Sequence, residues 1–292
     1  MAAEISVALA TSCDLRDLWA GDRLFLEELR RRGVRSDPVV WDDPSVDWRE
    51  WDVVVIRSCW DYHLKIDRFR AWLDALETGR VPLINPPFLV RWNLHKGYLL
   101  DAARAGARIP STRLVARGAG GSLREHVGAA GWTTSVIKPA ISASGHSTRL
   151  VAEAPSEDDE RAYEAMVAAG DVLLQAYVPE VRAHGEWSFV FFDGGFSHAV
   201  LKRAARGEFR VHIEWGGTVE RVEPPRRFVD QAQRLVDALD LGAAYARVDG
   251  TDVSGELTLM ELELVEPELF FDHHPQAAAR LADAVMRRTH RA

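Results

Sequence analysis

The stretch that most constrains how this chain folds is 245–268. In it, a short apolar run ending at Asp249 is followed by a polar linker and then by Leu-Met-Glu-Leu-Glu-Leu-Val-Glu-Pro. Side chains alternate along a strand, so Glu261 and Glu263 lie on one face. The linker Gly-Thr-Asp-Val-Ser-Gly favours a hairpin, and a hairpin centred near Gly255 places Asp249 opposite Glu261. The sequence therefore predicts that three carboxylates converge on one spot.

Like charges this close repel one another unless a cation lies among them. All-oxygen ligands suit Mg²⁺ or Mn²⁺ better than zinc or copper, and Mg²⁺ is usually bound by carboxylates together with substrate phosphates. We therefore predict a metal-nucleotide site. The alternative is an acidic edge strand that faces water. It ranks second because the strand also carries Leu257, Leu259, Leu262 and Leu264.

The composition narrows the class of protein. The chain has 292 residues, a net charge of −8 and 47% hydrophobic residues, which suits a globular protein of two or three lobes. The acidic balance argues against broad nucleic-acid binding, and no apolar run reaches membrane-spanning length. The first residues lack the features of a signal peptide. We expect a cytoplasmic protein acting on a small molecule, without nucleic-acid or membrane partners. A homo-oligomer is compatible with the sequence.

The first 90 residues alternate between strand and helix patterns. Strands are expected at 5–10, 38–41, 52–56 and 81–84, and helices at 22–32 and 66–76. This order predicts a parallel sheet with right-handed crossovers.

A polar and aromatic segment follows the buried strand 52–56. Ligands of open α/β sheets bind beyond the carboxyl ends of the strands, so Arg57, Trp60, Asp61 and Tyr62 are candidates to hold a small polar substrate. Arg57 would bind a carboxylate with two hydrogen bonds. An equally weighted alternative has Trp60 and Tyr62 filling an interface with the next lobe and Arg57 pairing with Asp61.

Two lysines lie at positions where an anion could bind. Lys96 is expected in the first turn of a helix that ends at Gly106, where a cation is unfavourable unless it faces an anion. Lys138 is expected at the end of a strand, directly before the loop 141–148, which is rich in small residues. Such loops let backbone N–H groups approach phosphate oxygens. The alternative for Lys138 alone is a solvated surface lysine.

The remaining patterns complete the expected order of elements. They predict a helix capped at Ser122, a helix at 156–169, a strand at 172–178, a hairpin of 185–192 with 196–203, a strand at 207–217, and helices at 226–239 and 274–288.

Six motifs now stand in a fixed order: Lys96, Lys138 with its loop, 175–178, Glu186, Arg210 with a double glycine, and Asp249 with Glu261 and Glu263. Over about residues 85–270 this set resembles the ATP-grasp superfamily, in its glutathione-synthetase-like branch. The resemblance implies an α/β fold with α+β lobes: an N-terminal parallel lobe (1–90), a central lid lobe (91–178) and a C-terminal lobe with the metal site (179–292). Stretches 57–62 and 202–210 are similar to the group of O-ureido-serine cyclo-ligases, which complete cycloserine formation.

The resemblance also implies roles for the nucleotide site. Lys96 and Lys138 hold the phosphates, and the loop with Ser142, Ser144 and Gly145 closes over them as a lid. The adenine is lined by Gln175, Ala176, Tyr177 and Val178. Glu186 accepts hydrogen bonds from the ribose. Asp249, Glu261 and Glu263 bind Mg²⁺ or Mn²⁺.

The catalytic candidates are Lys202, Arg210 and His212, with Arg210 facing the transferred phosphoryl group. Two positions depart from glutathione synthetase. Glu261-Leu-Glu263 stands where that enzyme has Glu-x-Asn, and His212 stands where it has an asparagine near the substrate. Because of the difference at His212, the substrate of glutathione synthetase is not carried over to this chain.

The implied activity is that of an ATP-dependent, ADP-producing carboxylate–amine ligase that forms an acyl phosphate on a small amino-acid-like substrate. The reaction is either intermolecular or an intramolecular cyclisation, as from O-ureido-D-serine to D-cycloserine. The alternatives are a ligase that adds an amino acid to a peptide or protein terminus, and an ATP-binding protein without catalysis.

Overall fold

The computed structural model describes residues 5–211 and 213–289. Its first sheet is parallel, as predicted. It contains β1 (Ser6–Thr11), β2 (Arg35–Val40), β3 (Val53–Ile56) and β4 (Leu83–Ile84), in the order β2-β1-β3-β4. All four residues of β3 are buried, because a parallel strand is covered on both faces. The helices of this region are α1 (Ala20–Arg31), α2 (Ile66–Thr78) and α3 (Pro87–Asn93), with one-turn helices at Cys13–Leu15 (η1), Trp48–Glu50 (η2) and Tyr62–Lys65 (η3).

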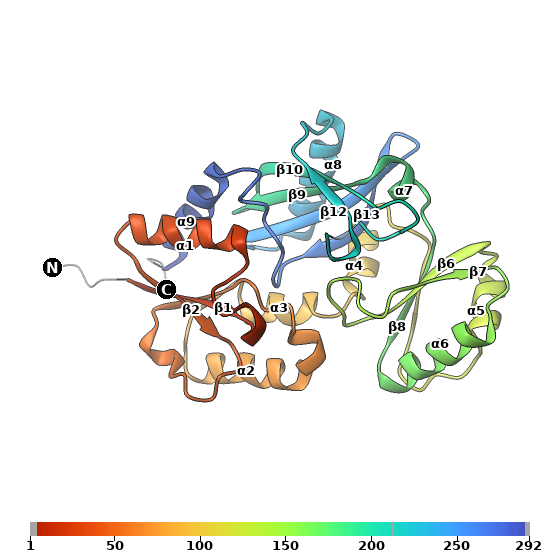
Figure 1. Cartoon of the computed structure of the whole chain (residues 1–292), viewed down its shortest axis with the longest axis horizontal. Coiled ribbons are helices and arrows are strands. Elements are labelled where there is room, and N and C mark those ends of the chain that lie inside the picture. Colours follow the sequence, from red (N-terminus) through yellow and green to blue (C-terminus); the bar gives the residue numbers. More distant parts are fainter. Residues whose placement is uncertain (1–4, 212, 290–292) are drawn as a thin grey trace.

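The second sheet is antiparallel and lies at one end of the molecule (Figure 1). Its order is β5 (Thr112–Val115), β8 (Val172–Ala176), β6 (Thr134–Pro139) and β7 (Arg149–Ala152). The helices α5 (Leu123–Ala130) and α6 (Glu157–Ala169) belong to the same region. The predicted cap of α5 is present, because the Ser122 hydroxyl accepts a hydrogen bond from the backbone N–H of Glu125 at 3.2 Å. Strand β7 was not predicted from the sequence.

The third sheet carries the acidic hairpin. Its order is β11 (Thr218–Glu220), β10 (Gly195–Arg203), β9 (Glu186–Phe192), β12 (Tyr245–Val253) and β13 (Glu256–Glu263), all antiparallel. Helices α4 (Tyr98–Arg104), α7 (Glu180–His184) and α8 (Arg226–Leu239) accompany it, and α8 has the predicted bounds. Gly185 precedes β9 with a φ of 85°, and a Cβ there would lie 2.6 Å from the Lys202 carbonyl oxygen, so only glycine fits.

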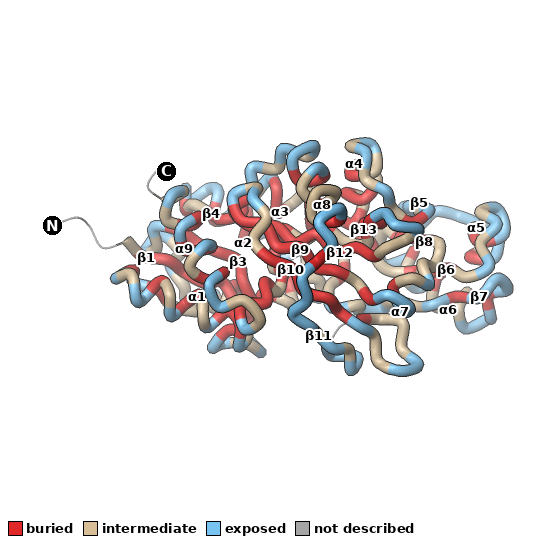
Figure 2. Tube along the Cα trace, turned by 90° about the horizontal axis from the view of Figure 1, so that it is seen from above, coloured by how far each residue is buried: buried red, intermediate tan, exposed pale blue. Residues whose placement is uncertain are grey.

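The last helix, α9 (Gln276–Thr289), returns to the start of the chain. It lies beside α1 in Figure 1, and its Leu281 and Val285 share a core with Val7 and Leu9 of β1. Buried segments run continuously through the middle of the molecule in Figure 2. No helix among the described residues combines the length and apolarity that a membrane crossing needs.

Two expected elements are wrong. A single helix over about 92–106 is replaced by α3 and α4, and the side chain of Asn93, the last residue of α3, bonds the end of β13 and the residue just beyond it. Its Nδ2 donates to the Leu262 carbonyl at 2.8 Å and its Oδ1 accepts from the Leu264 N–H at 2.7 Å. Lys96 therefore lies in the turn between the two helices.

The strand expected over 207–217 does not form in the described parts of that range, 207–211 and 213–217. Gly207 and Gly216 have φ values of 90° and 79°, which turn the chain instead of extending it. Described residues of this segment form a loop with a one-turn helix at Ile213–Trp215 (η4).

Asn85 ties the first sheet to the third. Its amide nitrogen donates to the carbonyls of Tyr245 and Leu264 at 2.9 Å each, and its amide oxygen accepts from the Ala244 N–H at 2.7 Å. All four residues are buried. The Tyr245 hydroxyl also connects the two sheets. It lies within hydrogen-bond distance of the Val265 carbonyl oxygen, at 2.9 Å, and of the Ile56 carbonyl oxygen, at 3.1 Å.

We expect Asn85→Ala to lower the free energy of unfolding by roughly 2–4 kcal/mol, because three buried backbone groups lose their partner. Urea unfolding followed by circular dichroism measures this change. Ser45→Ala, at an exposed position, is the control and should stay within about 0.5 kcal/mol of the wild type. An equally small loss for both variants would contradict the prediction.

Candidate active site

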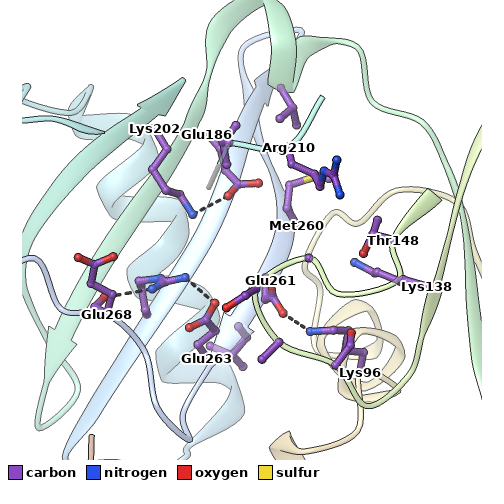
Figure 3. A pocket seen from close by; sticks show the side chains of 18 of the residues that line it. Lys96, Lys138, Thr148, Glu186, Lys202, Arg210, Met260, Glu261, Glu263 and Glu268 are labelled. Atoms are coloured by element: carbon purple, nitrogen blue, oxygen red, sulfur yellow. Dashed lines mark hydrogen bonds and ion pairs between the residues drawn. The ribbon is translucent and has the colours of Figure 1, made fainter. Parts of the chain in front are cut away.

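One cavity gathers side chains from all three sheets and their loops. Most of the predicted site residues line it: Trp60, Tyr62, Lys96, Lys138, Ser142, Ser144, Gly145, Gln175, Ala176, Tyr177, Val178, Glu186, Lys202, Arg210, Glu261 and Glu263. Figure 3 shows Lys96 and Lys138 on one side of the carboxylates and Glu268 on the other.

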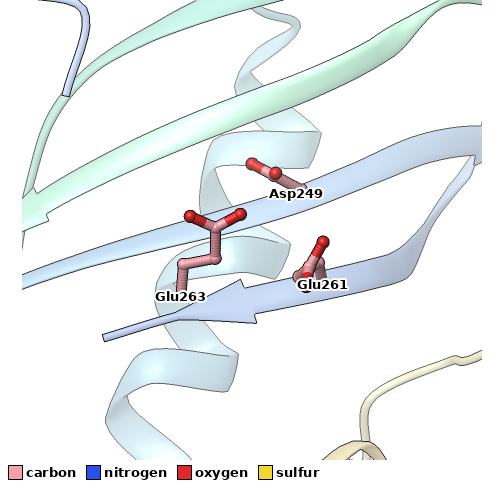
Figure 4. Close-up of side chains that lie close together, drawn as sticks. All are labelled: Asp249, Glu261 and Glu263. Carbon is pink, nitrogen blue, oxygen red and sulfur yellow. The ribbon is translucent and has the colours of Figure 1, made fainter. Parts of the chain in front are cut away.

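The three predicted carboxylates converge. Asp249 pairs with Glu261 across the hairpin, as expected from a turn near Gly255. A bulge between Asp249 and Gly250 shifts the register at that point. One oxygen from each of Asp249, Glu261 and Glu263 lies within 4.8 Å of the others (Figure 4). Leu257, Leu259, Leu262 and Leu264 are buried on the opposite face, so the hairpin is no acidic edge strand in water.

Basic side chains compensate these carboxylates. Arg247 Nη2 donates to Asp249 at 2.8 Å and also pairs with Glu263, while Lys202 lies 2.9 Å from Asp249 and 2.7 Å from Glu186. Lys96 pairs with Glu261. Burial alone would raise the pKa of Asp249, but Arg247 and Lys202 outweigh it and hold that pKa well below its usual range. Burial raises the pKa of Glu263 to about 7, since Arg247 offsets it only in part.

The donor set fits Mg²⁺. All three ligand groups are carboxylates at short mutual distances, and a hard divalent cation with oxygen ligands matches them better than a softer metal. Burial alone would raise the pKa of Glu261, but Lys96 and Lys138 lower it to about 2. This carboxylate is therefore ionised and available to a cation.

Lysine is rare in this chain, and its positions are informative. The sequence has four lysines, and Lys96, Lys138 and Lys202 all line the cavity. The fourth, Lys65, pairs with Asp61 at 2.7 Å. Burial lowers the pKa of Lys138 to about 8, and in Figure 3 it lies beside Thr148. The alternative of a solvated Lys138 is thus not supported, and the proximity of Lys138 to Lys96 suits polyphosphate.

The predicted adenine wall comes from the end of β8. Gln175 is buried and its Nε2 donates to Thr112 Oγ1 at 3.0 Å, which fixes the side chain on the neighbouring strand β5. Ala176 ends the strand, and Tyr177 and Val178 continue beyond it along the cavity.

Two loops border the cavity near Arg210. Arg210 is held by Glu208 at 2.8 Å, and its guanidinium lies 3.2 Å from the ring centroid of Trp215. Trp215 Nε1 in turn lies 3.4 Å from the Ser144 carbonyl oxygen, so this loop reaches the small-residue loop 141–148. His212, the third catalytic candidate, lies outside the described residues.

Two of the predicted substrate residues do not reach the cavity. Arg57 is 1% exposed, and its side chain pairs with Asp22 at 2.9 Å and not with Asp61. Asp61 instead accepts from Trp41 Nε1 at 2.8 Å and pairs with Lys65. The prediction that both bind substrate is wrong, because their charges are already paired inside the first lobe. Trp60 and Tyr62 do line the cavity.

Sequence reasoning missed several cavity residues, above all Glu266, Glu268 and Phe270, and it gave Arg247 no role. Glu266 and Glu268 could have been found from the sequence, since acidic residues, separated by other residues, continue after Glu263. Arg247 could have been found from its position two residues before Asp249, on the same strand face.

Comparison with solved structures gives the class of protein. D-alanine–D-alanine ligase from Bacillus anthracis, complexed with ATP, superposes with a TM-score of 0.66 at 14% identity, covering 98% of each chain. An ATP-grasp RimK domain protein from Sphaerobacter thermophilus gives 0.68 at 17%, covering 96% of this chain and 99% of that one. At these identities the likeness concerns the fold, and the fold is that of the ATP-grasp ligases.

More similar proteins narrow the class. Residues 7–85 match the family model described as the N-terminal domain of D-cycloserine synthetase DcsG. The chain is 32% identical over 283 residues to the cycloserine biosynthesis protein DcsG of Streptomyces lavendulae, covering 90% of this chain and 92% of that protein. The crystal structure of D-cycloserine synthetase DcsG superposes with a TM-score of 0.87 at 28% identity, covering 97% of this chain and 99% of that one. The chain belongs to the DcsG family of ATP-grasp ligases.

Proposed function

We propose that this protein uses Mg²⁺ and ATP to phosphorylate the carboxylate of a small amino-acid-like substrate, which a nitrogen of the same molecule then attacks. The single observation that carries the proposal is the cavity in which Lys96 and Lys138 face the carboxylate cluster. Its similarity to DcsG, named for cycloserine biosynthesis, makes O-ureido-D-serine the substrate to test and D-cycloserine the product.

The reaction needs positioning and neutralised charge more than covalent help from the protein. A carboxylate oxygen of the substrate attacks the γ-phosphorus and ADP leaves, which gives an acyl phosphate. The oxygen-linked nitrogen then attacks the acyl carbon, losing its proton as inorganic phosphate leaves. Water then cleaves the carbamoyl group from this nitrogen, and that group departs as CO₂ and ammonia. Lys96 and Lys138 hold the phosphates, and Arg210 faces the transferred group. Mg²⁺ bound by Asp249, Glu261 and Glu263 would neutralise phosphate charge.

The three sheets suggest how the work is divided. Residues 1–90 supply the aromatic wall with Trp60 and Tyr62, residues 91–178 carry Lys138 and the lid loop, and residues 179–292 carry the metal carboxylates. Glu186 would reach the ribose from β9.

The test is ADP release with Mg²⁺-ATP across a panel of small amino acids that includes O-ureido-D-serine, each with and without an added amine. ADP that depends on O-ureido-D-serine alone, with D-cycloserine found by mass spectrometry, is the expected result. ADP formed only when an acid and a separate amine are both present would replace cyclisation by intermolecular ligation. Absence of ATP binding would overturn the proposal.

Nucleotide affinity should fall above pH 8. Burial lowers the pKa of Lys138 to about 8 in the free protein, whereas nucleotide phosphates favour its charged form. Above pH 8, binding must therefore be accompanied by uptake of a proton, and affinity should drop by up to about tenfold per pH unit. Calorimetric titration with Mg²⁺-ADP between pH 7 and 9.5 measures this. Lys138→Arg keeps its charge over this range and should flatten the profile. Superimposable profiles would contradict the role of Lys138.

A further inference from the structure

We propose that Glu266 and Glu268 bind the ammonium group of an amino-acid substrate at the end of the cavity that faces away from Lys138. This inference rests on the proposed function and assigns an orientation to its substrate. In Figure 3, Glu268 lies beyond Glu263, on the opposite side of the carboxylate cluster from Lys96 and Lys138. Glu266 lines the same cavity. We call this region the acidic end.

The backbone that carries both carboxylates is held in place by side chains. Trp60 Nε1 donates to the Glu266 carbonyl at 3.1 Å, Arg57 Nη2 to that of Pro267 at 2.6 Å, and Arg247 Nη1 to that of Glu268 at 3.1 Å. Three successive carbonyls are thus fixed by donors from β12 and from the segment that follows β3. This explains the buried Arg57, which orients the acidic end without reaching substrate.

Among the described residues, no basic side chain forms a salt bridge with Glu266 or Glu268, and Lys96 and Arg247 act on them only at a distance. Within the part of the chain that the structure describes, the Glu266 carboxylate accepts a hydrogen bond only from its own backbone N–H, and Glu268 accepts only from Trp19 Nε1, a neutral donor, at 3.0 Å. The neighbouring Arg247 is already shared by Asp249 and Glu263. Burial and the Glu263 carboxylate raise the pKa of Glu266 well above its usual range. A bound cationic group would lower this pKa again and favour the ionised carboxylate.

Three aromatic rings in the same cavity suit an ammonium group. Trp60, Tyr62 and Phe270 line the same cavity, and aromatic faces attract cations. A phosphate or a second carboxylate would be repelled there. An amino acid whose ammonium lies at the acidic end directs its own carboxylate towards Glu261, Glu263 and the nucleotide. Its α-nitrogen stays protonated and is not the nucleophile, so another nitrogen of the substrate closes the ring.

The test combines Glu266→Gln, Glu268→Gln and the double variant with two probes, O-ureido-D-serine and its N-acetyl derivative. We expect each single variant to raise KM for O-ureido-D-serine by about 10- to 100-fold, the usual effect of removing a charged partner. The kcat and the affinity for Mg²⁺-ADP should change less than about threefold. The wild type should reject the N-acetyl derivative, and the double variant should discriminate less between the two probes.

Glu256→Gln is the matched control, since Glu256 begins the strand β13 that precedes Glu266 and pairs with Arg108 at the surface. Unchanged KM in both single variants, or equal use of both probes by the wild type, would overturn the inference. If O-ureido-D-serine supports no ADP release, the proposed function fails on its own. The acidic end is then judged by calorimetry in Mg²⁺-ADP, where free D-serine must bind more tightly than N-acetyl-D-serine for the inference to stand.

Discussion

Replacing Glu261 by glutamine is expected to lower the rate of ADP release by about a hundredfold or more. The carboxylate lies at the centre of the predicted metal site, opposite Asp249 and in contact with Lys96. Loss of one group that neutralises the transferred phosphoryl commonly has an effect of this size. The amide is nearly the same size as the carboxylate, so the cavity keeps its shape. Steady-state ADP release at several Mg²⁺ concentrations measures the effect.

The Mg²⁺ concentration that gives half-maximal rate should rise in the same variant, because one anionic ligand is lost. Glu256→Gln, at the exposed start of β13, should leave both values unchanged. If Glu261→Gln together with Asp249→Asn retained wild-type ADP release, the metal assignment would have to be abandoned.

Arg247→Met is expected to lower the free energy of unfolding by about 3–5 kcal/mol, the range typical of breaking a buried ion pair on one side. The Arg247 side chain is 7% exposed and pairs with both Asp249 and Glu263. The remaining carboxylates would stay buried beside each other. Urea unfolding in the presence of EDTA measures the loss without compensation by a metal.

Adding Glu263→Gln to Arg247→Met should restore part of the stability, because one of the uncompensated charges is then gone. Arg108→Met is the control. Its partner Glu256 is 62% exposed, and exposed ion pairs contribute at most about 1 kcal/mol. A loss for Arg247→Met no larger than that of the control would show that the carboxylates do not depend on this arginine.

Local patterns were enough to predict the fold class and the hairpin. Alternation and a Gly-containing turn placed Asp249 opposite Glu261, and the structure confirms this pair although a bulge follows it. The parallel sheet followed from the alternation of strand and helix. These features depend on residues near one another in the sequence, where periodicity and turn chemistry are decisive.

Long-range pairing limited the prediction elsewhere. The partner of Arg57 was not predicted because Asp22 lies 35 positions earlier, and the bond from Asn93 was missed because its acceptor lies 169 positions later. Glu266 and Glu268 gained importance only when the fold placed Trp60 and Tyr62 around the same cavity. No local pattern contains such contacts.

The rarity of lysine has a practical consequence for chemical modification. Lys65 is 34% exposed, whereas the side chains of Lys96 and Lys202 are 10% and 6% exposed. With nucleotide bound in the cavity, an amine-directed reagent should therefore react first at Lys65 among the lysines. Reaction at the others requires entry into the cavity, where bound nucleotide would shield them. Labelling or attachment to a support through lysine should thus be nearly uniform in orientation if it is carried out with nucleotide present.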